Sequence, residues 1–383
     1  MSPTKLLQAL AVMLRVAVFV WSGHAQAADD VVKDVILLGQ TADLSGSRAA
    51  NTKEFNAGAL AYFDGINKKG GIYGRRIQLV SKDDAYVIDR SVANARELIE
   101  KDRVFMIFAT VGTENFKAVE EKVTTPAKVP LFAPSSGAEV LRAPYKRYVF
   151  PVRAGYHAEM EKIIQHLTTV GIHRVAIFYD DDSFGKDILV GVERALGKRN
   201  LKIHSQASVD REGKLIGEAV KRIGPSQPEA TVVGSAGGTA IKFVREMLKQ
   251  GYDMPTYMNS GINVGSLTKE LGDSARGMAV VQLMPDVNDA SIAVAREYKK
   301  LAQSVPGKPL TTKGLEGYVA AKILVEGLKR AGKGLTRETF VQALDSLGEI
   351  DVGGIPVRYT DKEHTGVTYV DLAVITRGGK TLR

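Results

Sequence analysis

Three short segments of the chain carry residue types that can support catalysis, and each lacks a partner that the chemistry requires. Ser135 and Ser136 lie in a Pro-Ser-Ser-Gly turn, but the G-x-S-x-G pattern of a nucleophile elbow is absent. The glycine-rich segment 234–238 fits neither the dinucleotide-binding fingerprint nor the phosphate-binding P-loop. The acidic run 180–182 lacks the glycine and the terminal glutamate of a calcium loop. We therefore expect that the protein is not an enzyme.

Metal, cofactor and nucleic-acid chemistry receive no support from the composition. The chain of 383 residues has no cysteine, and none of its six histidines forms an H-E-x-x-H pattern. Its 52 lysines and arginines exceed its 43 acidic residues and give a net charge of +9, but they are scattered among the acidic residues. A nucleic-acid interface needs basic residues that cluster on one face. We therefore expect no metal, no cofactor and no nucleic-acid partner.

The first 27 residues have the features of a cleaved export signal. Lys5 supplies a positive start, an apolar stretch covers residues 6–20, and Ala25 and Ala27 form a small-x-small cleavage pattern. The apolar stretch is shorter than the roughly 20 residues that a membrane-spanning helix needs. We therefore predict a signal peptide over residues 1–27 and a periplasmic location for the mature protein.

The remaining chain alternates short apolar runs with amphipathic stretches, in two successive series. The first series predicts strands at 35–39, 76–80, 104–109 and 130–133, with helices at 54–67 and 91–101. The second series predicts strands at 174–179, 202–207 and 230–235, with helices at 156–170, 186–197, 215–222 and 239–250. Strands that alternate with helices of this length indicate parallel sheets covered on both faces. The sequence therefore predicts an α/β protein with two similar, doubly wound parallel-sheet lobes.

Polar and glycine-rich loops follow the predicted strands, and ligands bind at the carboxyl ends of strands in open parallel sheets. In the first series these loops are 41–46, 83–86, 110–115 and 134–137. In the second series they are 180–185, 235–238 and 259–264. Backbone N–H groups and hydroxyls at helix N-termini are good partners for carboxylates and other anions. We expect a ligand site where these loops meet.

An ordered set of motifs resembles the branched-chain amino acid binding proteins, which are type I periplasmic solute receptors of ABC transporters. The resemblance covers nearly the whole mature chain, and its most specific segments are 39–46, 55–58, 66–74, 83–84, 129–134, 181–185 and 272–278. It implies two lobes joined by three crossovers. The implied N-terminal lobe comprises residues 28–151 and 284–355, and the C-terminal lobe comprises 152–283 and 356–383. Ligand binds between the lobes, which close over it by a hinge motion.

The resemblance also implies which residues contact the ligand. Family members hold the ligand's carboxylate with hydroxyl and N–H groups, and the matching positions are Gly112, Thr113, Ser135 and Ser136. An aromatic side chain from the other lobe matches Phe184.

Two departures from the family pattern bear on the ligand. The acidic residue that holds the ligand's ammonium group falls on or near Gly261, and a tyrosine of the family falls near Ala236 or Gly237. A buried ammonium group without a counter-charge is costly. Glu114 and Asp180 are candidates to replace the missing charge. The spare volume at these small residues favours a small organic carboxylate, including an aromatic one, with an amino acid as the remaining possibility.

Three functions stay open for such a chain. The expected function is to deliver a small-molecule ligand to the membrane permease of an ABC transporter. A periplasmic sensor that presents its ligand to a membrane signalling receptor uses the same fold. A sugar-type repressor core also shares the two lobes, but it would need an N-terminal DNA-binding helix pair where the predicted leader stands.

Overall fold

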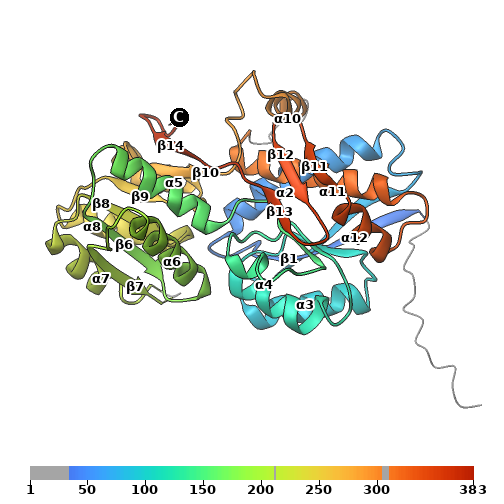
Figure 1. Cartoon of the computed structure of the whole chain (residues 1–383), viewed down its shortest axis with the longest axis horizontal. Helices are drawn as coiled ribbons and strands as arrows, with labels where there is room; N and C mark the ends of the chain where they lie inside the picture. Colours follow the sequence, from blue (N-terminus) through green and yellow to red (C-terminus); the bar gives the residue numbers. More distant parts are fainter. Residues whose placement is uncertain (1–33, 211–212, 304–309) are drawn as a thin grey trace, which may run out of the picture. The chain divides into compact units, whose positions relative to one another are not determined.

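The first sheet is built from five parallel strands in the order β2-β1-β3-β4-β5. Its strands are β1 (Val35–Ala42), β2 (Arg76–Asp83), β3 (Met106–Phe108), β4 (Leu131–Phe132) and β5 (Val149–Phe150). The helices packed around it are α2 (Ala49–Asn67), α3 (Ile88–Glu100), α4 (Thr113–Val119), α11 (Thr312–Ala331) and α12 (Arg337–Asp345). The computed structural model describes residues 34–210, 213–303 and 310–383, so the predicted leader at 1–27 lies outside the described residues (Figure 1).

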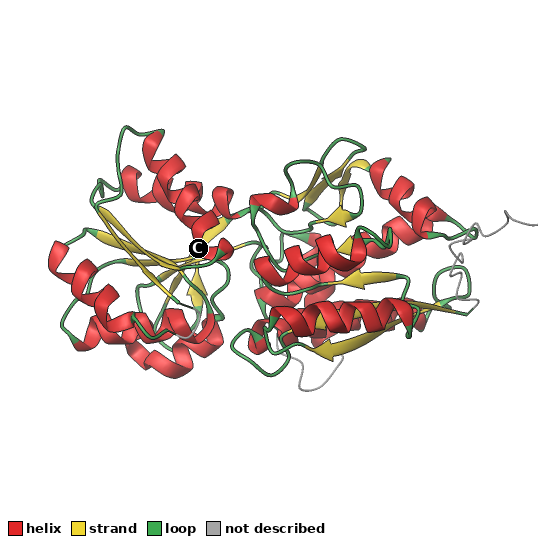
Figure 2. Ribbon diagram, turned by 90° about the horizontal axis from the view of Figure 1, so that it is seen from below, coloured by secondary structure: helices red, strands yellow, loops and turns green. Residues whose placement is uncertain are grey.

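The second sheet has seven strands in the order β15-β14-β10-β9-β8-β6-β7. Its strands are β6 (Val175–Asp180), β7 (Ser205–Val209), β8 (Ala230–Gly234), β9 (Thr256–Met258), β10 (Ala279–Gln282), β14 (Asp371–Ile375) and β15 (Thr381–Leu382). The helices of this half are α5 (Tyr156–Thr169), α6 (Ser183–Gly197), α7 (Ile216–Ile223), α8 (Gly237–Lys249) and α9 (Val264–Leu271). The strands pair in parallel except for β14 and β15, which pair antiparallel at one edge. Two helix-covered parallel sheets confirm the predicted fold class (Figure 2).

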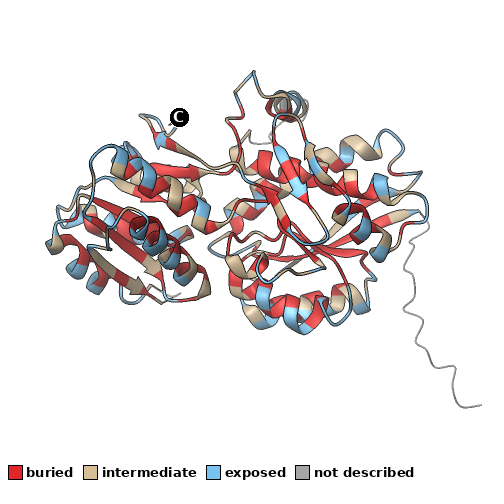
Figure 3. Cartoon of the chain, viewed as in Figure 1, coloured by how far each residue is buried: buried red, intermediate tan, exposed pale blue. Residues whose placement is uncertain are grey.

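The buried side chains follow from this layered arrangement. The strands β3, β4, β5 and β8 are buried at every residue because helices cover both faces of their sheets (Figure 3).

The remaining helical elements are α10 (Ala293–Gln303) and four short turns at Glu120–Thr124, Glu139–Leu141, Gly224–Ser226 and Gly272–Ala275. Within the described ranges, no helix is both long enough and apolar enough to cross a bilayer.

A third, three-stranded sheet belongs with the first sheet. It consists of β11 (Gly348–Asp351), β12 (Pro356–Tyr359) and β13 (His364–Val367), paired antiparallel. Tyr359 is fully buried against Phe150, at a ring-centroid distance of 5.7 Å, and its hydroxyl donates a 2.8 Å hydrogen bond to the carbonyl of Pro151. We call the first and third sheets with their helices the first lobe, and the second sheet with its helices the second lobe.

The chain passes between the lobes at three places. We propose crossovers near residues 151–155, 283–292 and 368–370, from the order of the strands in the sheets. The third lies later than the predicted division between residues 355 and 356. The difference arises because the antiparallel hairpin of β12 and β13 packs its apolar face on the core of the first lobe, and only β14 and β15 join the second sheet.

Glycines let helices α2 and α11 cross at very short range. A Cβ atom added at Gly58 would lie 1.8 Å from the carbonyl oxygen of Gly314, and one added at Gly317 would lie 1.9 Å from the carbonyl oxygen of Phe55. Gly58 and Gly317 therefore permit close packing of the two helices. This crossing brings the start of α11 next to the second and third turns of α2.

Candidate ligand-binding site

The carboxyl-end loops of both sheets meet around one cavity. Its volume is about 40 Å³, well below the roughly 300–1,000 Å³ range of ligand pockets, so a ligand larger than a few water molecules needs the walls to move apart. Its walls come from both lobes and from the first crossover. The lining residues are Arg48, Asn51, Thr52, Tyr86, Val111, Gly112, Ser135, Arg153, Tyr156, Phe184, Ala236, Gly261 and Lys313.

Five of the eight residues that the sequence singled out line this cavity. These are Gly112, Ser135, Phe184, Ala236 and Gly261. The other three lie behind its wall or beside it, and are described next.

Thr113 and Ser136 form a buried pair behind the cavity wall. Their hydroxyls share a 2.8 Å hydrogen bond, and the two residues are 1% and 0% exposed. The Ser136 hydroxyl also accepts a 3.2 Å hydrogen bond from the backbone N–H of Ala138. These bonds hold the loop that presents Ser135.

Gly237 and Gly261 were expected to leave spare volume, but in the structure both lie close to other parts of the chain. A Cβ atom at Gly237 would lie 2.7 Å from the carbonyl oxygen of Ser47. One at Gly261 would lie 2.7 Å from Oδ1 of Asn259 and 2.8 Å from Cβ of Ala236. Gly237 and Gly261 therefore let segments of this chain approach one another, and the expectation of spare volume for the ligand at these two positions was wrong.

Gly112 shapes one end of the cavity. Its φ of +96° favours glycine, and a Cβ atom there would lie 2.5 Å from the ring of Tyr86. The Gly112 carbonyl accepts the first hydrogen bond of α4, from the N–H of Phe116 at 2.9 Å. The Tyr86 ring can thus approach the backbone closely at the start of this helix.

The loop between β1 and α2 carries Arg48 to the cavity. Both oxygens of the Asp43 carboxylate accept backbone N–H bonds, from Gly46 at 2.5 Å and from Arg48 at 2.7 Å. Asp83, at the end of β2, accepts a further bond from the N–H of Leu44 at 2.8 Å. A Cβ atom at Gly46 would press on Asp43 at 2.8 Å, so the glycine is needed for this turn.

The Arg48 guanidinium lies between two aromatic rings. Its central carbon is 5.0 Å from the ring centre of Tyr86 and 5.4 Å from that of Phe184, within the range of cation–π contacts. One terminal nitrogen reaches Asp180 at 3.4 Å, whereas Nε is buried and has no hydrogen-bond partner. Arg48 therefore holds an unused donor at the cavity.

Asp180, at the end of β6, is a buried carboxylate whose pKa lies above its usual value. Burial raises its pKa to about 6, although the charge of Arg48 and a 2.5 Å hydrogen bond from the Ser235 hydroxyl lower it in part. Asp180 does not line the cavity. Glu114 does not line it either, and it accepts a 3.3 Å bond from the N–H of Ser183. Neither candidate for the missing ammonium partner faces the ligand space.

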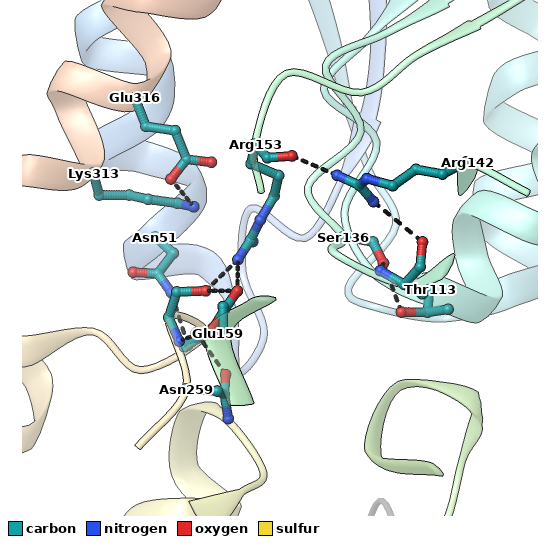
Figure 4. A network of polar contacts seen from close by, with 12 residues as sticks. Asn51, Thr113, Ser136, Arg142, Arg153, Glu159, Asn259, Lys313 and Glu316 are labelled. Carbon is teal, nitrogen blue, oxygen red and sulfur yellow. Dashed lines mark hydrogen bonds and ion pairs between the residues drawn. The ribbon is translucent and has the colours of Figure 1, made fainter. Parts of the chain in front are cut away.

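A second arginine reaches the cavity from the first crossover. Arg153 donates a 2.9 Å hydrogen bond to Glu159, whose carboxylate also accepts the N–H and the hydroxyl of Ser260 at 2.9 and 2.7 Å (Figure 4). The Arg153 guanidinium lies 5.4 Å from the ring centre of Tyr156. Arg153 is only 3% exposed, and its Nε has no hydrogen-bond partner.

A lysine from α11 completes the basic lining. Lys313 bonds Glu316 at 2.7 Å, one turn further along the helix, and its ammonium nitrogen lies 5.9 Å from the ring centre of Phe55 (Figure 4). Burial lowers the pKa of Lys313, while the charge of Glu316 opposes this and that of Arg153 adds to it.

Hydrogen bonds join the two lobes beside the cavity. Asn51 of α2 donates a 2.9 Å bond to the carbonyl of Gly261 and accepts a 3.0 Å bond from the amide of Asn263. Asn263 also donates to Glu54 at 2.8 Å. Together with the Arg48–Asp180 contact, these bonds hold the first turns of α2 against the loops of the second lobe.

The sequence interpretation missed the cations and two of the aromatic residues of this cavity. Arg48 follows the motif 39–46 by two residues, so its place after a strand end was a usable signal. Tyr86 closes one of the predicted loops, 83–86, but was not singled out. Arg153 and Tyr156 lie where the strand–helix pattern restarts. Lys313 carried no local signal, because it reaches the site only through the α2–α11 crossing.

Comparisons with known proteins agree with this architecture. A family model described as periplasmic binding protein matches residues 35–380. A Leu/Ile/Val-binding protein homolog from Brucella suis is 23% identical over 356 residues, which cover 88% of this chain and 86% of the relative. The crystal structure of a substrate-binding periplasmic protein from Ralstonia solanacearum is 35% identical, covers 91% of this chain and 99% of its own, and has a TM-score of 0.84.

A third comparison concerns a solute-binding protein of an ABC transporter from R. palustris, solved in complex with benzoate. It is 17% identical and superposes with a TM-score of 0.79 over 91% of this chain and 95% of its own, which shows the shared fold. The family consists of extracytoplasmic binding proteins and not of enzymes. The match over residues 35–380, the two parallel sheets and the cavity at their carboxyl ends lead to one conclusion. The chain belongs to the periplasmic binding proteins of type I, in the branched-chain amino acid binding family.

Proposed function

We propose that this protein is the periplasmic receptor of an ABC transporter, and that it binds a small organic carboxylate in the cavity and delivers it to a membrane permease. One observation carries the choice of ligand. Three cations, Arg48, Arg153 and Lys313, line the cavity, and no aspartate or glutamate is among its lining residues in the described part of the chain.

The hydrogen-bonding state of the arginines supports an anionic ligand. A buried donor without a partner costs about 1–3 kcal/mol, and hydrogen bonds to charged groups contribute about 1.5–3 kcal/mol. Arg48 and Arg153 each have an unused buried Nε at this cavity. A carboxylate can accept from such donors, with Ser135 and the backbone near Gly112 as further partners.

An α-amino acid fits the same cavity poorly. Its ammonium group would face three cations, and the nearby carboxylates of Asp180, Glu159 and Glu316 are already paired with them. Burying an ammonium group without an acceptor charge costs several kcal/mol. Benzoate in the R. palustris relative is a ligand of the class that we propose, although the likeness to that protein shows the fold alone.

The proposed delivery uses closure of the two lobes. The hydrogen bonds of Asn51 to Gly261 and of Asn263 to Glu54 cross between the lobes, so they are made only when the lobes meet. Ligand held by residues of both lobes would stabilise this state, as hinge closure does in periplasmic receptors. The predicted signal peptide over residues 1–27 fits an exported receptor.

A thermal-unfolding screen on refolded, ligand-stripped protein tests the ligand class. The compounds are α-amino acids, aliphatic carboxylates and aromatic carboxylates, each at about 1,000 times its Kd, where binding adds roughly 4 kcal/mol of stability. Carboxylate hits that Arg48→Gln abolishes and the exposed-site control Arg90→Gln retains would support the proposal. Leucine or valine hits without carboxylate hits would overturn it.

Uptake measurements separate transport from sensing. Deletion of this protein should abolish uptake of the radiolabelled ligand by the cells that produce it, because the permease receives ligand only from its receptor. A sensor subunit would instead leave uptake unchanged and remove the cellular response to the ligand.

A further inference from the structure

The three cations of the cavity stand in two groups with aromatic rings between them. Arg48 lies over Tyr86 and Phe184, and the Phe184 ring meets that of Tyr156 edge-on at 5.2 Å. The Tyr156 ring in turn faces Arg153 at 5.4 Å. Two cationic ends are thus joined by an apolar surface that Phe184 and Tyr156 provide.

The second end combines Arg153 with Lys313. The positive charge of Arg153 contributes to lowering the pKa of Lys313, after burial as the first cause, so the two cations lie within electrostatic reach of each other. Figure 4 shows the Arg153 side chain extending toward Glu159, with Lys313 and Asn51 on the neighbouring side. Two like charges in a buried position repel, and an anion between them removes this cost.

Arg153 and Lys313 each have an acidic partner, but these partners do not prevent an anion from binding at this end of the cavity. The Glu159 carboxylate accepts hydrogen bonds from Arg153 and from the N–H and hydroxyl of Ser260. Glu316 bonds Lys313 and lines a neighbouring cavity, not this one. Arg153 Nε, in a residue only 3% exposed, remains without a partner at the ligand space.

We propose that the ligand is a small dicarboxylate, with one carboxylate at Arg48 and the other at Arg153 and Lys313. Its hydrocarbon spacer packs against Phe184 and Tyr156. The inference rests on the proposed function, since it specifies which carboxylates the receptor takes. A monocarboxylate would bind at only one end of the cavity. The cations at the other end would keep the same contacts as in the ligand-free protein.

Titration calorimetry on the ligand-stripped protein tests this with matched pairs of compounds. Glutarate is compared with valerate, and isophthalate with benzoate, so that each pair differs by one carboxylate. One charge-assisted contact of about 1.5–3 kcal/mol corresponds to roughly 10- to 100-fold in affinity. We expect the dicarboxylate of at least one pair to bind more tightly by this factor. Equal affinities within both pairs would overturn the inference and leave the proposed function standing, whereas no carboxylate binding at all would overturn both.

A double variant tests the role of Lys313 without leaving a buried charge unpaired. Lys313→Gln with Glu316→Gln removes one cation and its partner together, and should reduce dicarboxylate affinity 10- to 100-fold while monocarboxylate affinity changes little. Lys322→Gln with Glu297→Gln is the matched control, because it removes a 2.6 Å ion pair between α11 and α10, away from the cavity. A retained preference for dicarboxylates in the Lys313 double variant would show that this ion pair is only structural and would contradict the inference.

Discussion

The two arginines of the cavity make similar contacts but differ in how firmly they are held. Arg48 and Arg153 each lie over a tyrosine ring, and each has an unpaired Nε. Arg153 bonds Glu159 at 2.9 Å in a network closed by Ser260, whereas Arg48 reaches its partner only at 3.4 Å.

The difference lies in the carboxylates behind the arginines. Glu159 is fully buried and accepts three hydrogen bonds, so it holds Arg153 permanently. Asp180 has a pKa near 6 because burial outweighs the attraction of Arg48. One end of the cavity is therefore a fixed part of the fold, and the other is a weak contact between the lobes that ligand binding and pH can alter.

The largest expected effect is the loss of the fixed arginine. Arg153→Met leaves the Glu159 charge buried without its partner, and breaking such a pair costs about 3–5 kcal/mol of unfolding free energy. Urea unfolding should show this loss, and Arg153→Met combined with Glu159→Gln should recover most of it. A single variant as stable as the parent protein would mean that the Arg153–Glu159 pair is not a fixed part of the fold.

The next effect is the pH dependence caused by Asp180. Its pKa rises from 3.8 in the unfolded chain to about 6 when folded, so the folded state binds more protons between these values. Stability therefore falls as pH rises through this range, by about 3 kcal/mol for a shift of roughly two units. The stability of the parent protein relative to Asp180→Asn should decline by this amount between pH 4 and pH 7. A difference that stays constant, or grows with pH, would show that the ion pair outweighs burial.

A smaller effect on stability is expected at the crossing of helices α2 and α11, which supports the Arg153–Lys313 end of the cavity. Gly58→Ala places a methyl group against the backbone of Gly314 and should cost about 1–3 kcal/mol, because α2 and α11 must move apart. Gly65→Ala in the same helix meets nothing within 4 Å and should instead add about 0.5–1 kcal/mol. Thermal unfolding of both variants measures the contrast. Equal behaviour of the two would show that the helix crossing adapts without cost.

The sequence was sufficient for the fold because hydrophobic periodicity and strand-end loops are local patterns. The strand predicted at 76–80 and the helix predicted at 156–170 appear as β2 (Arg76–Asp83) and α5 (Tyr156–Thr169). The helix predicted from residue 54 begins at Ala49, because the alanines and polar residues of its first turns carry no apolar period. That extension is what places Arg48 and Asn51 at the cavity.

The chemistry of the site could be predicted only in part. Loops such as 110–115 and 134–137 supply Gly112 and Ser135 to the cavity, as the strand-end rule leads one to expect. Lys313 could not be found this way, since its position depends on glycines of two distant helices that pack together. The absence of side chains at Gly237 was interpreted as ligand space, but only the folded chain shows that the carbonyl of Ser47 lies there.

The smallest expected effect on stability is that of Arg48→Gln at pH 5. It tests most directly whether Arg48 is held less firmly than Arg153. Below its pKa of about 6 the folded Asp180 is mostly protonated, so the variant loses one long hydrogen bond and the cation–π contacts to Tyr86 and Phe184 but leaves no buried charge unpaired, at a cost of about 1 kcal/mol. At pH 8 the carboxylate is ionised, and the loss of Arg48, which lowers the pKa of Asp180, raises the cost of burying that charge. Urea unfolding at the two pH values should therefore show a larger loss at pH 8. An equal loss at both would mean that Arg48 is held as firmly as Arg153, and that both ends of the cavity are fixed before ligand arrives.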